Sequence, residues 1–244
     1  MPRILVTNDD GVYSEGLHAL ADALRSIGDV TVVAPLGEAS AIGHALTIAR
    51  PLRLERLREG VYSVDGTPAD CVNLGVVHVL TGLPDLVVSG INKGYNLGDD
   101  VTYSGTVGGA LEGALLGTPG IAVSLQRTGE PFDFGPAAAA TERIAAQVLR
   151  HGLPARTLLN VNVPRGVPKG VKVTVQGMRN HVTKVAASMD PRGRPYYWIE
   201  EGEDTYADGE RADHVAVHEG YVSVTPLQPD LTAHAALALI EKLV

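Results

Sequence analysis

The sequence has a single cysteine, Cys71, among 244 residues, and aromatic side chains make up only 5% of the chain. One cysteine excludes an intramolecular disulfide and a cysteine-rich zinc site, and it suits a reducing compartment. No apolar run approaches the length of a membrane span, and the N-terminal segment turns polar at Asn8, before a signal-peptide core is complete. We therefore predict a cytoplasmic protein that does not enter a membrane, with Cys71 as a small buried apolar residue.

Basic side chains are also scarce, because 20 Lys and Arg face 28 Asp and Glu, for a formal net charge of -8. Binding to long nucleic acids draws on clustered Lys and Arg, so this balance argues against DNA or RNA as a partner. The charge is uneven: residues 150–199 carry nine basic side chains and one acidic one, and residues 200–219 carry eight acidic and one basic. This pattern fits either two complementary faces of an extended hairpin or an arm that pairs with a neighbouring subunit.

Short β-rich runs alternate with helical patterns over most of the chain, which is typical of βαβ units and a mostly parallel sheet. We therefore predict an α/β fold. The expected strands cover residues 4–7, 30–34, 86–88, 121–124 and 158–163, and the expected helices cover 14–28, 104–115 and 136–150.

Beyond Gly170 valines alternate with polar residues, which predicts half-exposed hairpin strands that include Val215 and Val217. An amphipathic helix over about 231–243 is expected to follow. Prolines and glycines between 164 and 170 mark a junction. We therefore predict a catalytic domain over 1–168 and a C-terminal extension over 169–244, a hairpin arm and a helix packed on the same domain.

Two adjacent carboxylates, Asp9 and Asp10, follow the first expected strand, where open α/β sheets place their ligand sites. Neighbouring Asp side chains repel each other unless solvent separates them or a cation bridges them. The alternative is an Asx-turn with Gly11 at a positive φ. The motif alone leaves both interpretations open.

A second polar segment, residues 89–107, lies between an expected buried strand and a helix. Its glycines allow close approach of a ligand, and Asn92 and Asn96 offer amide groups. The helix start at Ser104, Gly105 and Thr106 presents backbone N–H groups and hydroxyls, which is the physics of a phosphate site. The alternative is a long loop without function before a well-capped helix, although such loops are uncommon in compact domains.

A third loop, after the second expected strand, contains Ser40, a weak ligand for a hard cation, and an isolated histidine, His44. The sequence has no Gly-x-Ser-x-Gly elbow, no Gly-x-Gly-x-x-Gly turn after the first strand and no Walker-type Gly-Lys-Thr. These absences weaken a serine hydrolase, a dinucleotide-binding protein and a P-loop enzyme as interpretations.

Taken together, motifs in order along nearly the whole chain resemble the SurE (survival protein E) nucleotidases. The matching segments are Asn8-Asp9-Asp10-Gly11, Ser40, residues 66–72, residues 89–92 with Gly94, Asn96 and Gly98, residues 100–101, residues 103–107, Glu112-Gly113, residues 160–164 and residues 225–227. One departure is Leu36-Gly37, where family members often carry Asp-Arg, so that a basic contact is missing.

The resemblance implies a three-layer α/β/α Rossmann-like domain with a C-terminal extension that forms a homo-oligomer, a dimer or a tetramer. It also implies a divalent-metal-dependent phosphatase acting on nucleoside monophosphates. Carried over by residue, the ligands of one Mg²⁺ or Mn²⁺ ion per subunit are Asp9, Asp10, Ser40 and Asn96. The phosphate contacts are Asn92, Ser104, Gly105 and Thr106.

The resemblance therefore implies a 5'-nucleotidase, and these residues suit hydrolysis of nucleoside monophosphates by metal-activated water. All-oxygen ligands suit Mg²⁺ or Mn²⁺ and disfavour zinc. Asp9 and Asp10 are the candidate catalytic residues, and either one is a candidate base. The Asp-x-Asp spacing usual for a phospho-aspartyl intermediate is missing. The alternative is a non-enzymatic, metal-dependent module that binds or senses nucleotides with the same loops.

Overall fold

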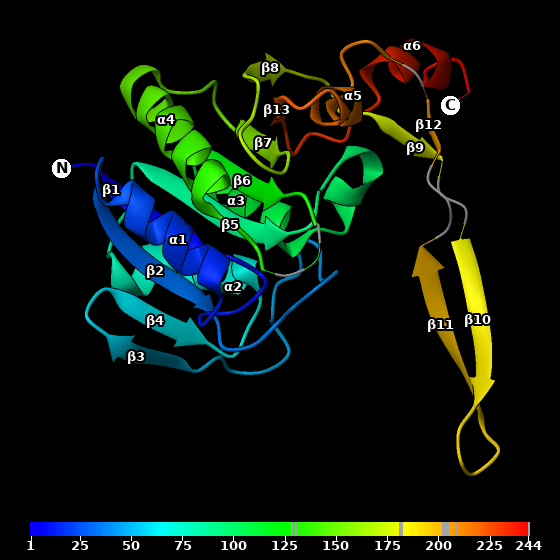
Figure 1. Ribbon diagram of the computed structural model, residues 1–244, viewed down its shortest axis with the longest axis horizontal. Helices are drawn as coiled ribbons and strands as arrows, with labels where there is room; N and C mark the ends of the chain where they lie inside the picture. The colour runs from blue at the N-terminus through cyan, green and yellow to red at the C-terminus, as the bar shows by residue number, and fades with distance from the viewer. Residues whose placement is uncertain (128, 130, 181–182, 202–204, 208, 244) are drawn as a thin grey trace.

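The computed structural model describes residues 1–127, 129, 131–180, 183–201, 205–207 and 209–243 (Figure 1). The strands are β1 (Arg3–Thr7), β2 (Asp29–Pro35), β3 (Leu54–Arg58), β4 (Val61–Val64), β5 (Leu86–Lys93), β6 (Gly120–Leu125), β7 (Leu158–Val163), β8 (Val171–Val173), β9 (Met178–Asn180), β10 (Thr183–Met189), β11 (Pro195–Glu201), β12 (Thr205–Ala207) and β13 (Val222–Leu227). The helices are α1 (Glu15–Leu24), α2 (Pro68–Leu74), η1 (Gly75–Val79), η2 (Gly98–Thr102), α3 (Gly105–Leu115), α4 (Gly135–His151), α5 (Asp213–His218), η3 (His234–Ala236) and α6 (Leu237–Ile240).

Within these residues one large sheet has the strand order β3-β4-β2-β1-β5-β6-β7-β13-β8. The strands from β4 to β7 in this order run parallel, whereas β3 pairs antiparallel with β4 and β13 pairs antiparallel with β7. The carboxyl ends of β1, β2, β5, β6 and β7 therefore meet at one edge of the sheet.

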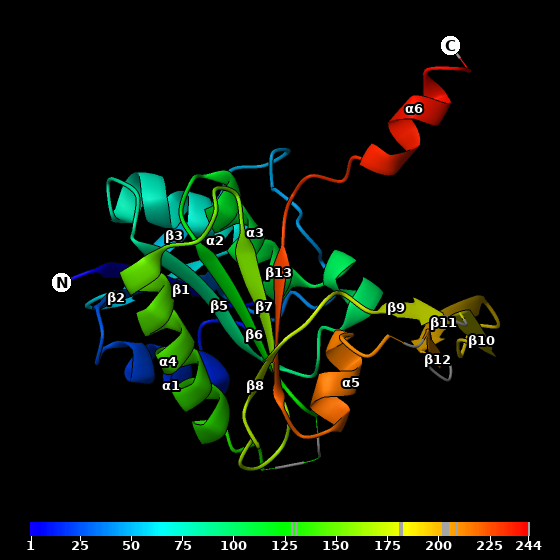
Figure 2. The same ribbon diagram turned by 90° about the horizontal axis from the view of Figure 1, so that it is seen from above.

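Helices cover both faces of this sheet, with α1 and α4 on one side and α2 and α3 on the other (Figure 2). The alternation along β1 shows why: Ile4 and Val6 join the core beneath α1 and α4, and Leu5 joins the core beneath α2 with the buried Cys71. A strand with apolar residues on both faces must be covered twice. The predicted three-layer α/β fold and the buried cysteine are confirmed.

The C-terminal extension contributes to the same sheet, because β13 and β8 are its last two strands. The boundary predicted at residue 168 falls between β7 and β8, within this sheet.

A hairpin of β10 and β11 projects from the body as an arm, which confirms the predicted C-terminal hairpin (Figure 1). The short pair β9 and β12 lies at its base. The hairpin register places Lys184 opposite Glu200. Residues 181–182, 202–204 and 208 of the basic and acidic stretches lie outside the described residues.

Two predictions for the extension need correction. Val215 and Val217 were expected to alternate in a strand, but they lie in helix α5. Two valines are too few to distinguish the two-residue repeat of a strand from the 3.6-residue repeat of a helix. In the structure the helix buries Ala216 and Val217. The terminal helix is shorter than the predicted 231–243, since its helical residues are those of η3 and α6.

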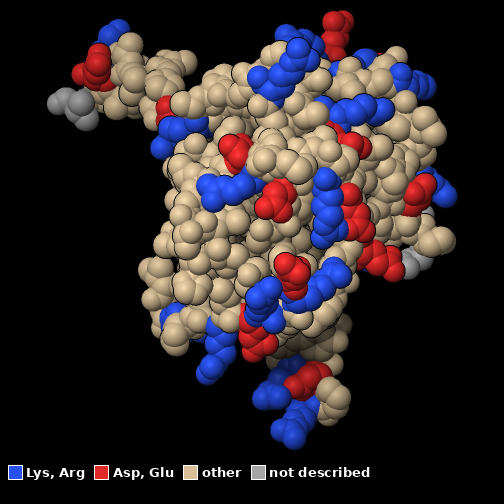
Figure 3. Space-filling view, turned by 90° about the vertical axis from the view of Figure 1, so that its left-hand side faces the viewer, with Lys and Arg blue, Asp and Glu red and all other residues tan. Residues whose placement is uncertain are grey.

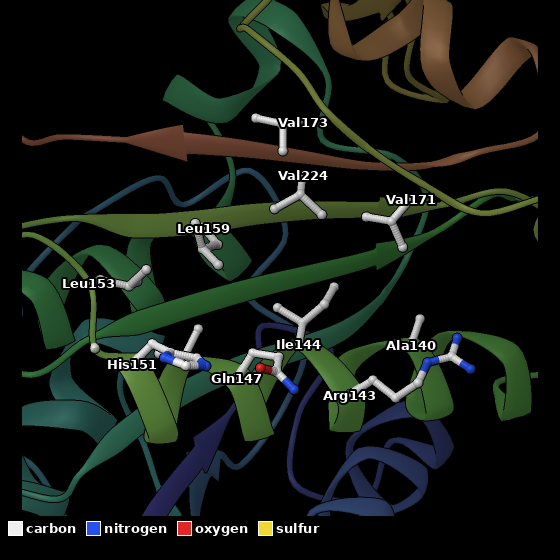
Figure 4. Close-up of a pocket in the computed structure, with 12 residues that line it drawn as sticks. Ala140, Arg143, Ile144, Gln147, His151, Leu153, Leu159, Val171, Val173 and Val224 are labelled. Carbon is white, nitrogen blue, oxygen red and sulfur yellow. The ribbon is translucent and has the colours of Figure 1, made fainter.

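An apolar groove of about 510 Å³ lies between α4 and the strands β7, β13 and β8. Figure 4 shows Ile144 of α4 facing Leu159, Val171 and Val224 across it. On the face shown in Figure 3, Lys and Arg side chains are interspersed with Asp and Glu. No helix among the described residues is both long and apolar enough to cross a bilayer.

Candidate functional site

The loops that follow β1, β2, β5 and β6 surround a cavity of about 740 Å³ at the carboxyl edge of the sheet. The structure brings most of the predicted site residues to this cavity. Those that line it are Asp9, Asp10, Ser40, Asn92, Asn96 and Ser104. Gly105 and Thr106 lie directly behind them, at the start of α3.

Asp9 is the most enclosed carboxylate of the cavity, since its residue is only 6% exposed. The Thr106 hydroxyl donates a hydrogen bond of 2.5 Å to Asp9 Oδ1, and the Thr106 backbone N–H also donates to the carboxylate. Burial raises the pKa of Asp9, and these hydrogen bonds only partly oppose the shift. The buried Thr106 side chain therefore serves Asp9 here, and its predicted contact with a phosphate stays a prediction.

The start of α3 approaches Asp9 closely because residue 105 is glycine. A Cβ at Gly105 would lie 2.9 Å from the Asp9 Cβ and 3.0 Å from Asp9 Oδ2. Ser104 caps the helix by accepting a hydrogen bond of 3.1 Å from the Val107 N–H, as its position before the apolar stripe predicts. The carboxylate pair and the helix N-terminus are thus parts of a single site.

Asp10 carries the clearest sign of a missing partner. Burial, followed by the negative charge of Asp9, raises the pKa of Asp10 to about 6. Its Oδ2 atom is buried and accepts no hydrogen bond from any described residue. An orphaned carboxylate oxygen beside a second carboxylate is costly unless a cation neutralises the pair. The donors present fit a hard divalent ion, for which oxygen ligands are preferred.

Asn96 is held in one orientation. Its Nδ2 donates to Ser124 Oγ at 2.7 Å, so the side-chain amide nitrogen is engaged and the oxygen is left for a ligand. Its backbone N–H donates to Asn162 Oδ1 at 2.9 Å. The Asn96 carbonyl accepts from Asn160 Nδ2 at 2.8 Å and from Asn162 Nδ2 at 3.0 Å. Asn160 and Asn162 of β7 therefore fix the backbone of the loop at Asn96.

Ser40 lines the cavity from the loop after β2. Its hydroxyl donates to Glu38 Oε1 at 2.6 Å, which leaves the lone pairs of the hydroxyl oxygen available to a cation. The N–H of Ala39 donates to the Asp9 carbonyl at 2.8 Å, so this loop is joined to β1 beside the carboxylates.

The isolated His44 anchors the same loop from outside the cavity. Its Nε2 lies 2.5 Å from Glu112 Oε2, and Asn73 Nδ2 donates to Glu112 Oε1 at 2.8 Å. Burial alone would raise the pKa of Glu112, but the hydrogen bonds from His44 and Asn73 outweigh it and lower the pKa. His44 thus connects the Ser40 loop to α2 and α3.

Several residues of the cavity were not predicted from the sequence. Lys93 and Arg127 bring positive charge to its wall, and Glu38 and Asp100 bring two more carboxylates beside Asp9 and Asp10. Lys93 follows Asn92, and Arg127 comes two residues after β6, so the strand-end rule that selected Asp9 applies to both.

The asparagines Asn160 and Asn162 were noted only as part of a motif, and Ser124 was not noted at all. Their shared signal is a polar side chain within an apolar strand, where an unpaired polar group is costly. Each of the three is fully buried.

Comparisons with known proteins show the family of the chain. A family model described as "Survival protein SurE" matches residues 4–183. The chain is 54% identical to the 5'-nucleotidase SurE of Syntrophotalea carbinolica, over 94% of this chain and 92% of that protein. It is 52% identical to the 5'-nucleotidase SurE 1 of Thermus thermophilus, over 99% of this chain and 97% of that protein.

A solved structure has the same fold. The crystal structure of the SurE protein from Aquifex aeolicus superposes with a TM-score of 0.89 at 47% sequence identity, and the match covers 99% of both chains. The fold, including the C-terminal extension, is therefore common to both proteins.

We expect Ser124→Ala to weaken Mn²⁺ binding about tenfold, because Asn96 loses the partner that orients its amide, and supporting residues of metal sites have effects of this order. Isothermal titration calorimetry measures the affinity of each variant for Mn²⁺. Ser89→Ala on the neighbouring strand is the matched control, since Ser89 Oγ is buried and has no hydrogen-bond partner among the described residues. Equal Mn²⁺ affinity in wild type and Ser124→Ala would contradict the orienting role.

Proposed function

The chain belongs to the SurE family, and from this premise we propose that it is a 5'-nucleotidase, a phosphomonoesterase that converts nucleoside monophosphates to nucleoside and phosphate. One observation carries the proposal: a single cavity combines two adjacent carboxylates, the buried Asp9 and the partly buried Asp10, with the N-terminus of α3. Relatives about half identical over nearly the whole chain are named 5'-nucleotidases. These names favour the enzyme over the alternative of a non-enzymatic nucleotide sensor.

The enzyme is proposed to use one divalent cation per subunit, Mg²⁺ or Mn²⁺, with Asp9, Asp10, Ser40 and Asn96 as ligands. The orphaned Asp10 oxygen and the fixed orientation of Asn96 support this ligand set. When bound, the ion supplies Lewis acidity toward a phosphoryl oxygen and lowers the pKa of a coordinated water. A cytoplasmic location stays a prediction.

The chain's own residues are proposed to hold the phosphate and to receive the proton. Asn92, Ser104 and the N–H of Gly105 face the equatorial oxygens, where a helix N-terminus favours negative charge. Lys93 and Arg127 add positive charge from the wall. Asp10 suits the base better than Asp9, because Thr106 already donates two hydrogen bonds to Asp9.

The nucleoside is proposed to lie along the outer part of the cavity, beyond the phosphate. Tyr103 directly precedes the phosphate-binding helix start, lines the cavity and is 60% exposed. Ile199 of the arm also lines the cavity. An exposed aromatic ring beside an apolar side chain offers stacking that every base can use.

Self-association is proposed through the C-terminal extension. The arm and α6 stand away from the body (Figures 1 and 2), and both expose large apolar side chains. Exposed examples are Val185, Met189, Tyr197, Trp198, Ile199, Leu237, Leu239 and Ile240. Contiguous apolar surface of this kind marks protein–protein contact. A dimer or a tetramer would bury it.

Phosphate release tests the activity. Wild-type protein with Mn²⁺ is expected to release phosphate from nucleoside 5'-monophosphates, and a chelator is expected to stop the release. Nucleoside 3'-monophosphates tested alongside measure the preference for the 5' position. Nucleotide binding without phosphate release in the presence of Mn²⁺ or Mg²⁺ would favour the sensor instead.

Asp9→Asn is expected to lower turnover by about three orders of magnitude or more, since metal-assisted charge stabilisation contributes several kcal/mol. The fold should persist, because the change removes a buried negative charge. Phosphate release and thermal unfolding measure the two effects. Asp22→Asn, at an exposed position of α1, is the control. Near-normal metal-dependent turnover of Asp9→Asn would refute the assignment.

Tyr103→Ala is expected to raise the KM for nucleoside monophosphates about tenfold, because base stacking on an aromatic ring contributes about 1–3 kcal/mol. Glycerol phosphate has no base, so its KM should stay unchanged. Steady-state kinetics with both substrates provides the comparison, and Tyr13→Ala, which removes another exposed tyrosine outside the cavity lining, is the control. Equal losses for both substrates would place the base elsewhere.

Trp198→Ser is expected to reduce the assembly to a lighter species, because Trp198 is 65% exposed on the arm and apolar contact is the proposed driving force. Light scattering coupled to size exclusion at equal protein concentration measures the mass. Val77→Ser, at a 71% exposed position in η1, controls for the loss of any surface apolar group. An unchanged mass in Trp198→Ser would exclude this arm contact.

A further inference from the structure

A fully buried carboxylate lies outside the ligand set, at the first residue of α5. Asp213 is 0% exposed and belongs to the C-terminal extension. Its Oδ2 accepts a hydrogen bond of 2.8 Å from the Gly98 N–H, and its Oδ1 accepts from the N–H groups of Gly177 at 3.1 Å and His214 at 2.8 Å. Burying a charge is costly, and three backbone donors offset that cost.

The first of these contacts reaches the loop that carries Asn96. Gly98 lies two residues after Asn96 and has a φ of +52°, a conformation that suits glycine. Asn160 and Asn162 hold the Asn96 backbone from β7, and Asp213 holds Gly98 from the other side. The loop is therefore fixed on both sides of the bend that presents the Asn96 side chain.

The second contact reaches the base of the arm. Gly177 directly precedes β9, on the outgoing side of the arm, and Asp213 follows the returning side. The two sides pair, since Asp213 N–H donates to the Val175 carbonyl at 3.0 Å. A Cβ at Gly177 would lie 2.8 Å from Asp213 Oδ1, so the carboxylate requires glycine there.

We propose that Asp213 is a positioning residue that couples the seating of the arm to the orientation of Asn96 in the metal site. The proposal rests on the proposed metal site. The buried Asp213 carboxylate joins both sides of the arm's base to the loop that carries Asn96. Because energetic coupling between two sites is reciprocal, metal binding must also stabilise the arm's base.

Asp213→Asn tests the contact selectively. The amide oxygen can serve the two donors of Gly177 and His214, and the NH₂ group then faces the Gly98 N–H, so the bond to the loop is lost while the bonds at the arm's base remain. The dissociation constant for Mn²⁺ is expected to rise about tenfold, as for other supporting residues of metal sites. At saturating Mn²⁺ the kcat should return to the wild-type value.

Thr174→Val is the matched control. Thr174 is buried in the same extension, and its hydroxyl bonds to the hydroxyls of Ser223 and Thr225, each at 2.7 Å, without reaching the loop. This variant should lose stability and keep its Mn²⁺ affinity. Equal Mn²⁺ affinity in Asp213→Asn and wild type, or a kcat loss that Mn²⁺ does not restore, would overturn the proposal.

Hydrogen exchange of the wild-type protein tests the coupling without a substitution, should Asp213→Asn fail to fold. Mg²⁺ is expected to slow exchange of amides at the arm's base, at Gly177 and its neighbours, as well as in the loop around Gly98. Slowing confined to the loop would overturn the proposal. Wild-type protein that binds neither Mg²⁺ nor Mn²⁺ would instead refute the metal site itself, and the inference would fall with it.

Discussion

The repulsion between two neighbouring carboxylates governs the site. Asp9 and Asp10 follow a strand that is buried on both faces, and burial raises the pKa of each. Water cannot relieve this repulsion at Asp9, which is nearly enclosed. The Thr106 hydroxyl and N–H relieve part of it, and the proposed cation would neutralise the rest. With that cation bound, an acidic cavity would suit a phosphate dianion.

The position of Asn96, a neutral member of the proposed ligand set, depends on preorganisation by buried side chains. Asn96 is useful to a cation only if its oxygen faces the cavity, and Ser124 ensures this by accepting from its nitrogen. Asn160 and Asn162 pair with the backbone of the same residue. These side chains are buried, and their hydrogen bonds hold the loop in one shape before any ligand arrives.

Features that depend on local sequence were predictable, and those that depend on distant partners were not. The strand-end rule placed Asp9 and Asp10, and the capping position of Ser104 followed from the apolar stripe after it. The partners of Asn96 lie 28–66 residues further along the chain, so no local spacing in the sequence connects them. Helix α5 was mistaken for a strand because a six-residue segment is too short to reveal its period.

The order in which the site's parts occur along the chain has a consequence for synthesis. Asp9 bonds to Thr106, 97 residues later, Asn96 bonds to Asn162, 66 residues later, and Gly98 bonds to Asp213, 115 residues later. A nascent chain emerging from the ribosome thus acquires both aspartates long before Asp213, and the asparagine loop gains its support from Asp213 only after that residue has been synthesised. Contacts of such long sequence separation form slowly. Binding of the proposed cation would therefore reach full strength only after the segment that contains Asp213 has been made.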